Sequence, residues 1–311
     1  MSRLWYALGL LGALACGSGQ RPLPAPVEQA AAGLPLPAST ALAVRVDLAS
    51  LRAELGDTLA QQVLLDAVSL GESARASKLL ARSLERASLM WVAATGAPLD
   101  EAGKVLLVRG HFESLDPTGE LRGWRRQPSG VEALEVPDAE QNPGGYARVY
   151  RRAGDDLAVW APRGELVDVE RALAPRRAAQ PVALGLPPPE RGTLSVAARP
   201  EPLLELYQRR YPELVERFRG LRQVEAFAEP TAGTWRTDLL LYFETAEQAT
   251  GASAVVERLK VALSQRSCAI GVVARVLSVT TFERNLRLQA WLEGADLDSV
   301  RSCVLGSGCC A

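Results

Sequence analysis

The chain has 311 residues, of which 48% are hydrophobic and 23% charged, and its formal net charge is −1. These proportions are those of an ordinary globular protein that is long enough for two domains with buried cores. The near-neutral charge argues against nucleic-acid binding, because that function requires a strongly basic surface.

The first residues have the organisation of a secretory signal peptide. After a short basic start, an apolar run extends from Leu4 to Ala15, and this run is too short for a membrane span, which needs roughly 20 residues. It ends in Leu14-Ala15-Cys16, which resembles the lipobox of bacterial lipoproteins, except that Ala13 stands where that family prefers leucine. The resemblance implies that residues 1–15 are removed and that Cys16 is acylated twice, which gives stable anchoring.

The chain that follows Cys16 is expected to leave the membrane through a flexible segment. Residues 16–40 are rich in proline, alanine and glycine, which is typical of a tether. Gly17 follows the cysteine, and by resemblance to Gram-negative sorting the lack of aspartate there implies an outer-membrane protein that faces the periplasm. The alternative is an ordinary signal peptide cut near Ala15, which would leave a free cysteine.

Four further cysteines lie close to the C-terminal end, at Cys268, Cys303, Cys309 and Cys310. An even number of cysteines in an oxidising compartment predicts disulfides, which here would fix the tail to the folded body in an order that the sequence leaves open. The alternative is a metal site, but the spacing matches no zinc pattern and no histidine is near. We therefore expect structural disulfides, and no metal or cofactor.

Two segments of the mature chain resemble each other on either side of a proline-rich stretch. The pairs Phe112/Phe243 and Trp160/Trp291 are each 131 residues apart, and Ala147-Arg148-Val149 recurs as Ala274-Arg275-Val276. Ordered matches at near-constant spacing indicate a duplicated unit. The predicted organisation is a first repeat at 41–180, a linker at 181–192 and a second repeat at 193–311.

Each repeat is predicted as a β-α-β-β-α-β-β-α unit of the α+β class, with mostly antiparallel sheets and helices on one face. The second half gives the clearest pattern, because Thr245 and Gln248 form a capping-box signature before a helix that runs to about Leu263. Its other expected elements are strands at 193–199, 222–228, 234–243, 272–281 and 286–292, a helical stretch at 201–218 that is bent near Pro212, and a last helix from Asp296. The first half is expected to contain a helical region at 48–87 and an irregular stretch at about 116–145.

We find no motif that predicts catalysis. There is no phosphate-binding glycine loop, nucleophile elbow or zinc-protease helix, and His111 is the single histidine of the chain. Asp155-Asp156 is best explained as a hairpin turn, and Asp296 as a helix cap. An envelope hydrolase of unrecognised type remains an alternative, because catalytic carboxylates can lie far apart in the chain.

Strand alternation predicts a polar sheet face that carries arginine, tyrosine and tryptophan in each repeat. These residue types dominate binding hot spots, so we expect an envelope protein to bind there. The candidate residues are Trp160, Tyr150, Arg109 and Arg148 in the first repeat, with Trp291, Tyr242, Arg236 and Arg287 in the second. The alternative is that these faces are covered and the tryptophans belong to ordinary cores.

The start of the predicted body resembles that of many uncharacterised bacterial lipoproteins. They too begin with a proline, a strand ending in Val-Asp-Leu and a helix, as at Leu36–Arg52 here, and a later strand ends in Gly-x-Phe, as at Gly110–Phe112. The resemblance implies no activity. The sequence thus predicts a non-enzymatic, lipid-anchored envelope protein with a binding or assembly role, with a hydrolase or a solute-binding lipoprotein as alternatives.

Overall fold

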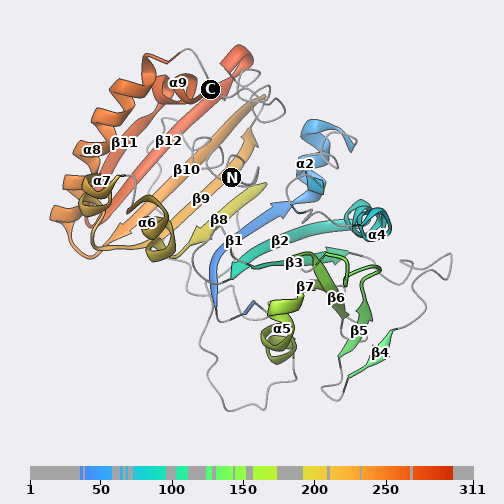
Figure 1. Ribbon diagram of the computed structural model, residues 1–311. Coiled ribbons are helices and arrows are strands. Elements are labelled where there is room, and N and C mark those ends of the chain that lie inside the picture. The colour runs from blue at the N-terminus through green and yellow to red at the C-terminus, as the bar shows by residue number, and fades with distance from the viewer. Residues whose placement is uncertain are drawn as a thin grey trace. The chain divides into compact units, whose positions relative to one another are not determined.

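The chain divides between Pro188 and Pro189 into two compact units in the computed structural model (Figure 1). Described residues up to 173 belong to the first unit and those from 192 to the second. The structure describes residues 36–37, 39–57, 64–65, 68, 73–95, 103–110, 124–127, 131–142, 144–151, 157–173, 192–208, 211–231, 233–266 and 269–296.

The first unit is a mixed α+β unit built on seven described strands. Its strands are β1 (Thr40–Asp47), β2 (Ala87–Thr95), β3 (Gly103–Gly110), β4 (Arg125–Arg126), β5 (Glu132–Glu135), β6 (Tyr146–Arg151) and β7 (Leu157–Pro162). Its helices are α2 (Leu48–Leu55), α4 (Ala74–Glu85), the 3-10 turn η2 (Arg163–Glu165) and α5 (Leu166–Leu173). The strands form an antiparallel sheet in the order β1-β2-β3-β7-β6-β5-β4.

Side-chain caps define where α2 and α4 begin. Asp47 accepts a hydrogen bond from the backbone N–H of Ser50 at 3.0 Å, and Ser73 accepts one from Ala76 at 3.3 Å. Such caps satisfy backbone donors that have no partner inside the helix. Within the described residues, the predicted helical region at 48–87 includes the capped helices α2 and α4.

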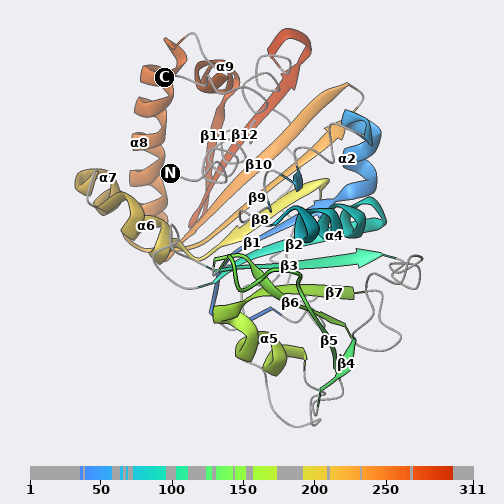
Figure 2. The same cartoon turned by 45° about the vertical axis from the view of Figure 1, so that its right-hand side comes forward.

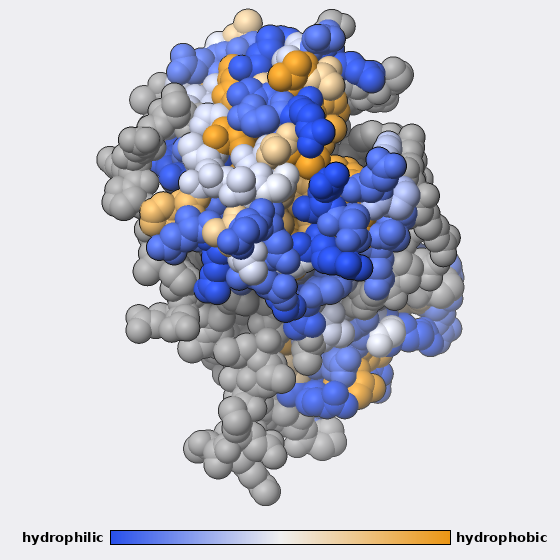
Figure 3. Space-filling model, turned by 90° about the vertical axis from the view of Figure 1, so that its left-hand side faces the viewer, coloured by the Kyte–Doolittle hydropathy of each residue, from blue (hydrophilic) through white to orange (hydrophobic). Residues whose placement is uncertain are grey.

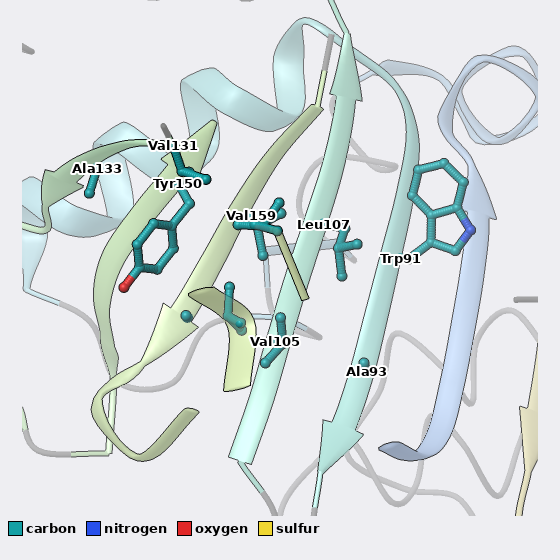
Figure 4. Close-up of a cluster of buried hydrophobic side chains, with 11 residues drawn as sticks. Trp91, Ala93, Val105, Leu107, Val131, Ala133, Tyr150 and Val159 are labelled. Atoms are coloured by element: carbon teal, nitrogen blue, oxygen red, sulfur yellow. The ribbon is translucent and has the colours of Figure 1, made fainter. Parts of the chain in front are cut away.

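Helices lie on both sides of the first unit's sheet. On one side, α5 adds Val169 and Leu173 to a buried cluster that includes Leu107 and Val159 from the strands (Figure 4). On the opposite side, Tyr146 contacts the Trp160 ring and donates a hydrogen bond from its hydroxyl to the carbonyl of Val68, which lies between α2 and α4 in the sequence. The expectation of helices on a single face is therefore wrong for this unit.

The second unit is also α+β, with five described strands. They are β8 (Leu194–Ala198), β9 (Leu221–Thr231), β10 (Thr234–Phe243), β11 (Ser278–Phe282) and β12 (Asn285–Glu293), in the antiparallel order β8-β9-β10-β12-β11. The helices are α6 (Pro200–Gln208), α7 (Pro212–Arg217), α8 (Ala246–Ser264) and α9 (Ala269–Val276). The break between α6 and α7 confirms the bend predicted near Pro212, which fits the first turn of α7 because proline needs no N–H partner there.

Helix α8 covers one face of the second unit's sheet (Figures 1 and 2). It begins with the predicted capping box, in which Thr245 and Gln248 bond each other's backbone N–H groups. Its buried residues Ala249, Ala252 and Val256 recur at helical spacing and meet Leu241 and Leu288 of the strands. This hydrophobic cluster fixes which face of β10 and β12 is apolar.

Two local expectations were wrong. The predicted strand at 272–281 is divided between helix α9 and the shorter strand β11. Val272 and Val273 are buried and α9 packs against α8, so tertiary packing overrides the strand preference of valine. Consequently the match between Ala147–Val149 and Ala274–Val276 pairs a strand with a helix. The stretch expected to be irregular, 116–145, contains the short strands β4 and β5.

Candidate functional site

The candidate site is the face of the second unit's sheet that lies opposite α8. Residues paired across antiparallel strands point to the same side, and Arg236 pairs with Trp291 while Asp238 pairs with Gln289. Alternation along each strand adds Tyr242 and Arg287 to that side. We call this set the polar face, and its members are Arg236, Asp238, Tyr242, Arg287, Gln289 and Trp291. The four residues predicted to share this face, Arg236, Tyr242, Arg287 and Trp291, do so in the observed register.

A buried carboxylate occupies the centre of the polar face. Asp238 on β10 is 0% exposed and accepts hydrogen bonds from three side chains. The Nε of Arg287 lies 2.7 Å from its Oδ1, and the Nε of Arg236 lies 3.1 Å from its Oδ2. Gln289 on β12 donates its side-chain amide to Oδ1. Each carboxylate oxygen therefore has a cationic donor, which compensates the cost of burying the charge.

The network continues outward from Arg236. Its Nη1 forms an ion pair with Glu229 of β9 at 3.5 Å, and its guanidinium carbon lies 5.6 Å from the centre of the Trp291 ring. That distance is typical of a cation–π contact. With two arginines and two carboxylates the group has no formal net charge, so it does not form a strongly basic anion site.

A second polar group lies on the same face, beside Tyr242. The Tyr242 hydroxyl donates to Glu225 at 3.1 Å, and the Gln223 amide donates to the other oxygen of that carboxylate at 2.8 Å. Both partners are on β9, the neighbouring strand. Glu225 and Glu229 were missed from the sequence, although both occupy polar positions of the alternating pattern in β9.

The polar face is less open than its composition suggested. Asp238 and Gln289 are buried, the side chains of Arg236 and Arg287 are only 16% and 11% exposed, and Tyr242 and Trp291 are half-buried. The polar face is buried because the long side chains of Arg236 on β10 and Arg287 on β12 both extend over the carboxylate of Asp238. The polar face therefore combines paired polar groups with two half-buried aromatic rings, Trp291 and Tyr242.

The first unit does not bring its predicted residues onto one open face. Trp160 on β7 is 1% exposed, and its ring meets Tyr146 edge to face at 5.7 Å between ring centres. It pairs with Leu106 and lies on the side of Tyr146 and Val68, which is covered. The alternative of an ordinary core tryptophan is therefore correct for Trp160.

Arg109, Arg148 and Tyr150 lie on the other side of that sheet, the side of α5. The Arg109 guanidinium is 5.3 Å from the centre of the Trp91 ring, and the Arg148 Nε pairs with Glu135 at 2.6 Å. The fully buried Tyr150 belongs to the hydrophobic cluster beneath α5 (Figure 4). These residues are thus separated from Trp160 by the thickness of the sheet.

Helix α5 is fixed to this sheet by a hydrogen-bonded group around Glu170. The Tyr150 hydroxyl donates to Glu170 Oε1 at 2.6 Å, and the Nη1 of Arg148 pairs with the same oxygen at 3.3 Å. Burial, and next the hydrogen bond to Glu170, raise the pKa of Tyr150, so the neutral hydroxyl is favoured. The pKa of Arg148 is raised chiefly by its interaction with Tyr150 and further by Glu135.

Buried indole groups without acceptors recur in the described part of the chain. The Nε1 atoms of Trp91, Trp160, Trp235 and Trp291 are buried and have no hydrogen-bond partner. Since two of these rings lie under arginines and one packs on a tyrosine, the unpaired N–H of Trp291 does not by itself mark a ligand site.

Several predicted residues lie outside the described residues. They are Cys16, Cys268, Cys303, Cys309, Cys310, His111, Asp155 and Asp156. Within the part of the chain that the structure describes, no three histidine, cysteine or acidic side chains are grouped as metal ligands. None of the helices described there is both long enough and apolar enough to cross a bilayer.

Comparison with known proteins gives only distant structural likeness. The sequence matches no protein-family model and no curated protein. Crystal form I of TP0453 is 11% identical with a TM-score of 0.43, covering 95% of this chain and 98% of that one. Crystal form III of TP0453 is 10% identical with a TM-score of 0.45, covering 85% of this chain and 94% of that one.

Proposed function

We propose that this protein is a lipid-anchored component of a bacterial cell envelope that binds another protein through the polar face of its second unit, without catalysing a reaction. The single observation that supports the binding site is the polar face itself. Two arginines, a tryptophan and a tyrosine occupy one face of β10 and β12 around the buried Asp238. Arginine, tryptophan and tyrosine carry most of the binding energy in protein interfaces.

The electrostatics of the polar face favour a protein as the partner. Arg236 and Arg287 are already paired with Asp238 and Glu229, so no net positive charge is left to attract a polyanion. Paired arginines are held in one orientation, which lowers the entropy lost when a partner binds. Trp291 and Tyr242 then supply rigid, partly exposed apolar area beside fixed hydrogen-bonding groups.

The anchoring part of the proposal rests on Leu14-Ala15-Cys16. Growth with radioactive palmitate should label the wild-type protein and leave Cys16→Ala unlabelled. The labelled protein should sediment with outer membranes and face the periplasm, whereas the variant should be recovered in the soluble fraction. Label that persists in Cys16→Ala would contradict the anchor.

The binding site is tested by photocrosslinking in the native envelope. A photoreactive phenylalanine analogue at position 242, on the polar face, should capture a protein that the same analogue at position 207 does not capture. Tyr207 is the matched control, because it is an exposed tyrosine on α6. Identical products from both positions would contradict the polar face as the interface.

The captured protein, once purified, allows a quantitative test. Trp291→Ala should weaken its binding about tenfold or more, as expected for a tryptophan hot spot. Circular dichroism and the unfolding midpoint show whether the variant is folded, and Trp291→Phe replaces it if it is not. Equal affinity of the wild type and a folded Trp291 variant would contradict the proposal.

We also propose that the two units arose by duplication. The support is their strand order. In each unit the first three strands of the chain are neighbours in sequence order, and the last strand of the unit lies beside the third: β1-β2-β3-β7-β6 in the first unit and β8-β9-β10-β12-β11 in the second. The tryptophan match needs revision, however. In the first unit, Trp160 lies on the sheet face that contacts Val68, in the segment between α2 and α4. In the second unit, the residue after α7, Phe218, belongs to the hydrophobic cluster on the α8 face, and Trp291 lies on the opposite face. The two tryptophans are therefore on non-equivalent faces. A shift one residue different from 131 would place equivalent faces together.

A further inference from the structure

Strand β11 forms an edge of the second unit's sheet. Among the described residues it pairs with β12 alone, and its outer side carries no other strand. Its sequence is Ser-Val-Thr-Thr-Phe, without a charged residue or a proline. Thr280, Thr281 and Phe282 are exposed, and Phe282 is 56% exposed although it is aromatic.

An unprotected edge strand is unusual, because free N–H and C=O groups attract further strands. The edge strand β4 of the first unit shows the usual protection. It has two residues, Arg125 and Arg126, and both are exposed and charged. β11 has neither the short length nor the charges, and its valine and threonines favour strand pairing.

The hairpin geometry shows which backbone groups of β11 are directed outward. Phe282 pairs with Asn285 across the two-residue turn Glu283-Arg284, which makes it the hydrogen-bonded closing pair. Hydrogen-bonded and non-bonded pairs alternate along an antiparallel ladder, so the N–H and C=O groups of Thr280 point to β12. Those of Val279 and Thr281 therefore point to the free edge.

We propose that β11 pairs with β11 of a second copy of this chain, antiparallel, about a two-fold axis that passes through Thr280. In this register Val279 of each copy lies opposite Thr281 of the other, and these pairs exchange the outward backbone hydrogen bonds. The two Thr280 residues form the close, non-bonded pair on the axis, where threonine pairs are favourable. The exposed ring of Phe282 lies over Ser278 of the second copy.

The charge pattern favours a second copy as the occupant. Like charges that meet across the axis would destabilise a strand paired with itself, and the five residues of β11 carry no charge. The surface seen from the side of α8 shows hydrophobic patches interrupted by hydrophilic residues, without a broad apolar field among the coloured residues (Figure 3). On this side of the unit, strand pairing at the edge needs no broad apolar surface to bury.

The test uses pairs of charged variants of the chain from residue 16 onward, with Cys16→Ser to prevent acylation. Wild-type protein should show a concentration-dependent dimer in sedimentation equilibrium. Thr280→Lys and Thr280→Glu should each weaken the dimer about tenfold, since like charges then meet on the axis. An equimolar mixture of the two variants should form heterodimers in native mass spectrometry, because opposite charges meet instead.

The matched control is Ser88→Lys, which adds the same charge to an exposed residue of the interior strand β2 and should leave the dimer unchanged. Circular dichroism verifies that each variant is folded, and Thr280→Val should dimerise like the wild type. A monomeric wild type at all concentrations would overturn the proposal. So would folded charge variants that dimerise as well as the wild type, or a mixture that forms no heterodimer.

Discussion

Asp238 and its two arginines form a buried polar group in the second unit. The carboxylate is fully buried, and each of its oxygens accepts a hydrogen bond from an arginine. Burying a charge is costly, and pairing repays that cost only while every partner is present. We therefore expect the network to add little to the net free energy of folding. Its main effect is to favour the one pairing of β10 and β12 in which all partners meet.

Asp238→Asn is expected to lower the free energy of unfolding by about 2–3 kcal/mol, because Arg236 and Arg287 lose the buried carboxylate with which both of them pair. Glu229→Gln is the matched control, since Glu229 pairs with Arg236 at a 39% exposed position. Its loss should stay below about 1 kcal/mol, as for other partly exposed ion pairs. Urea denaturation measures both. Equal losses for the two variants would show that burial of Asp238 is not the decisive factor.

Tyr150 should make the stability of the protein sensitive to alkaline pH. Its pKa is raised in the folded state, so the unfolded chain, where tyrosine ionises near pH 10, loses the proton first. The stabilisation is complete below about pH 10 and is lost as pH rises through the higher folded-state pKa. The free energy of unfolding should thus fall more steeply above pH 10 in the wild type than in Tyr150→Phe.

Urea denaturation between pH 7 and 11 measures this difference. At neutral pH, Tyr150→Phe should lose about 1.5–3 kcal/mol, the contribution of a hydrogen bond to a charged group such as Glu170. Tyr207→Phe is the control, because Tyr207 is 47% exposed and should leave the pH profile unchanged. Parallel pH profiles for the wild type and Tyr150→Phe would refute the linkage.

At the scale of elements, the β11–β12 hairpin contains a locally unfavourable residue. Glu283 has a φ of +50° at the first position of a two-residue turn, where glycine is preferred. Glutamate carries a steric cost in this conformation that glycine avoids.

Glu283→Gly is therefore expected to raise the free energy of unfolding by about 0.5–1 kcal/mol, since the relief of strain exceeds the added entropy of the unfolded chain. Arg284→Gly, at the next position of the same turn, has no positive φ to relieve and should lower stability. Thermal unfolding of both variants tests the contrast. A stability loss in Glu283→Gly would mean that the glutamate side chain makes a compensating interaction.

Which elements were predictable depended on how local their signals are. The capping box at Thr245 and the bend at Pro212 were predicted because both act through a few neighbouring residues. The strand expected at 272–281 failed because Val272 and Val273 suit a strand as well as a buried helix, and contacts with α8 decided the outcome. Strands β4 and β5 were missed because they are two and four residues long.

At the scale of the whole chain, each unit contains its own hydrophobic cluster. The first is centred on Leu107 and Val159, and the second on Leu241 and Leu288. Separate clusters allow the units to respond separately to a core substitution.

Trp160→Ala should destabilise the first unit by about 3–5 kcal/mol, as for other buried tryptophans that leave a cavity. Hydrogen exchange followed by mass spectrometry should show faster exchange in β1–β3 and β6–β7, with β8–β12 unchanged. Leu288→Ala in the second cluster is the matched control and should reverse the pattern. Faster exchange throughout the chain in both variants would show one cooperative unit instead.

The sequence by itself determined the α+β class, the antiparallel strands, the capping box and the residues that share the polar face of β10 and β12. These properties follow from periodicity and short-range hydrogen bonding, which depend on spacing along the chain. The signal peptide and the lipid anchor at Cys16 stay predictions from sequence. Only the tertiary structure decided that Trp160 is a core residue and that Arg236 and Arg287 converge on Asp238. Burial and pairing depend on which elements cover a sheet and which side chains meet across strands, and alternation alone carries no information on either.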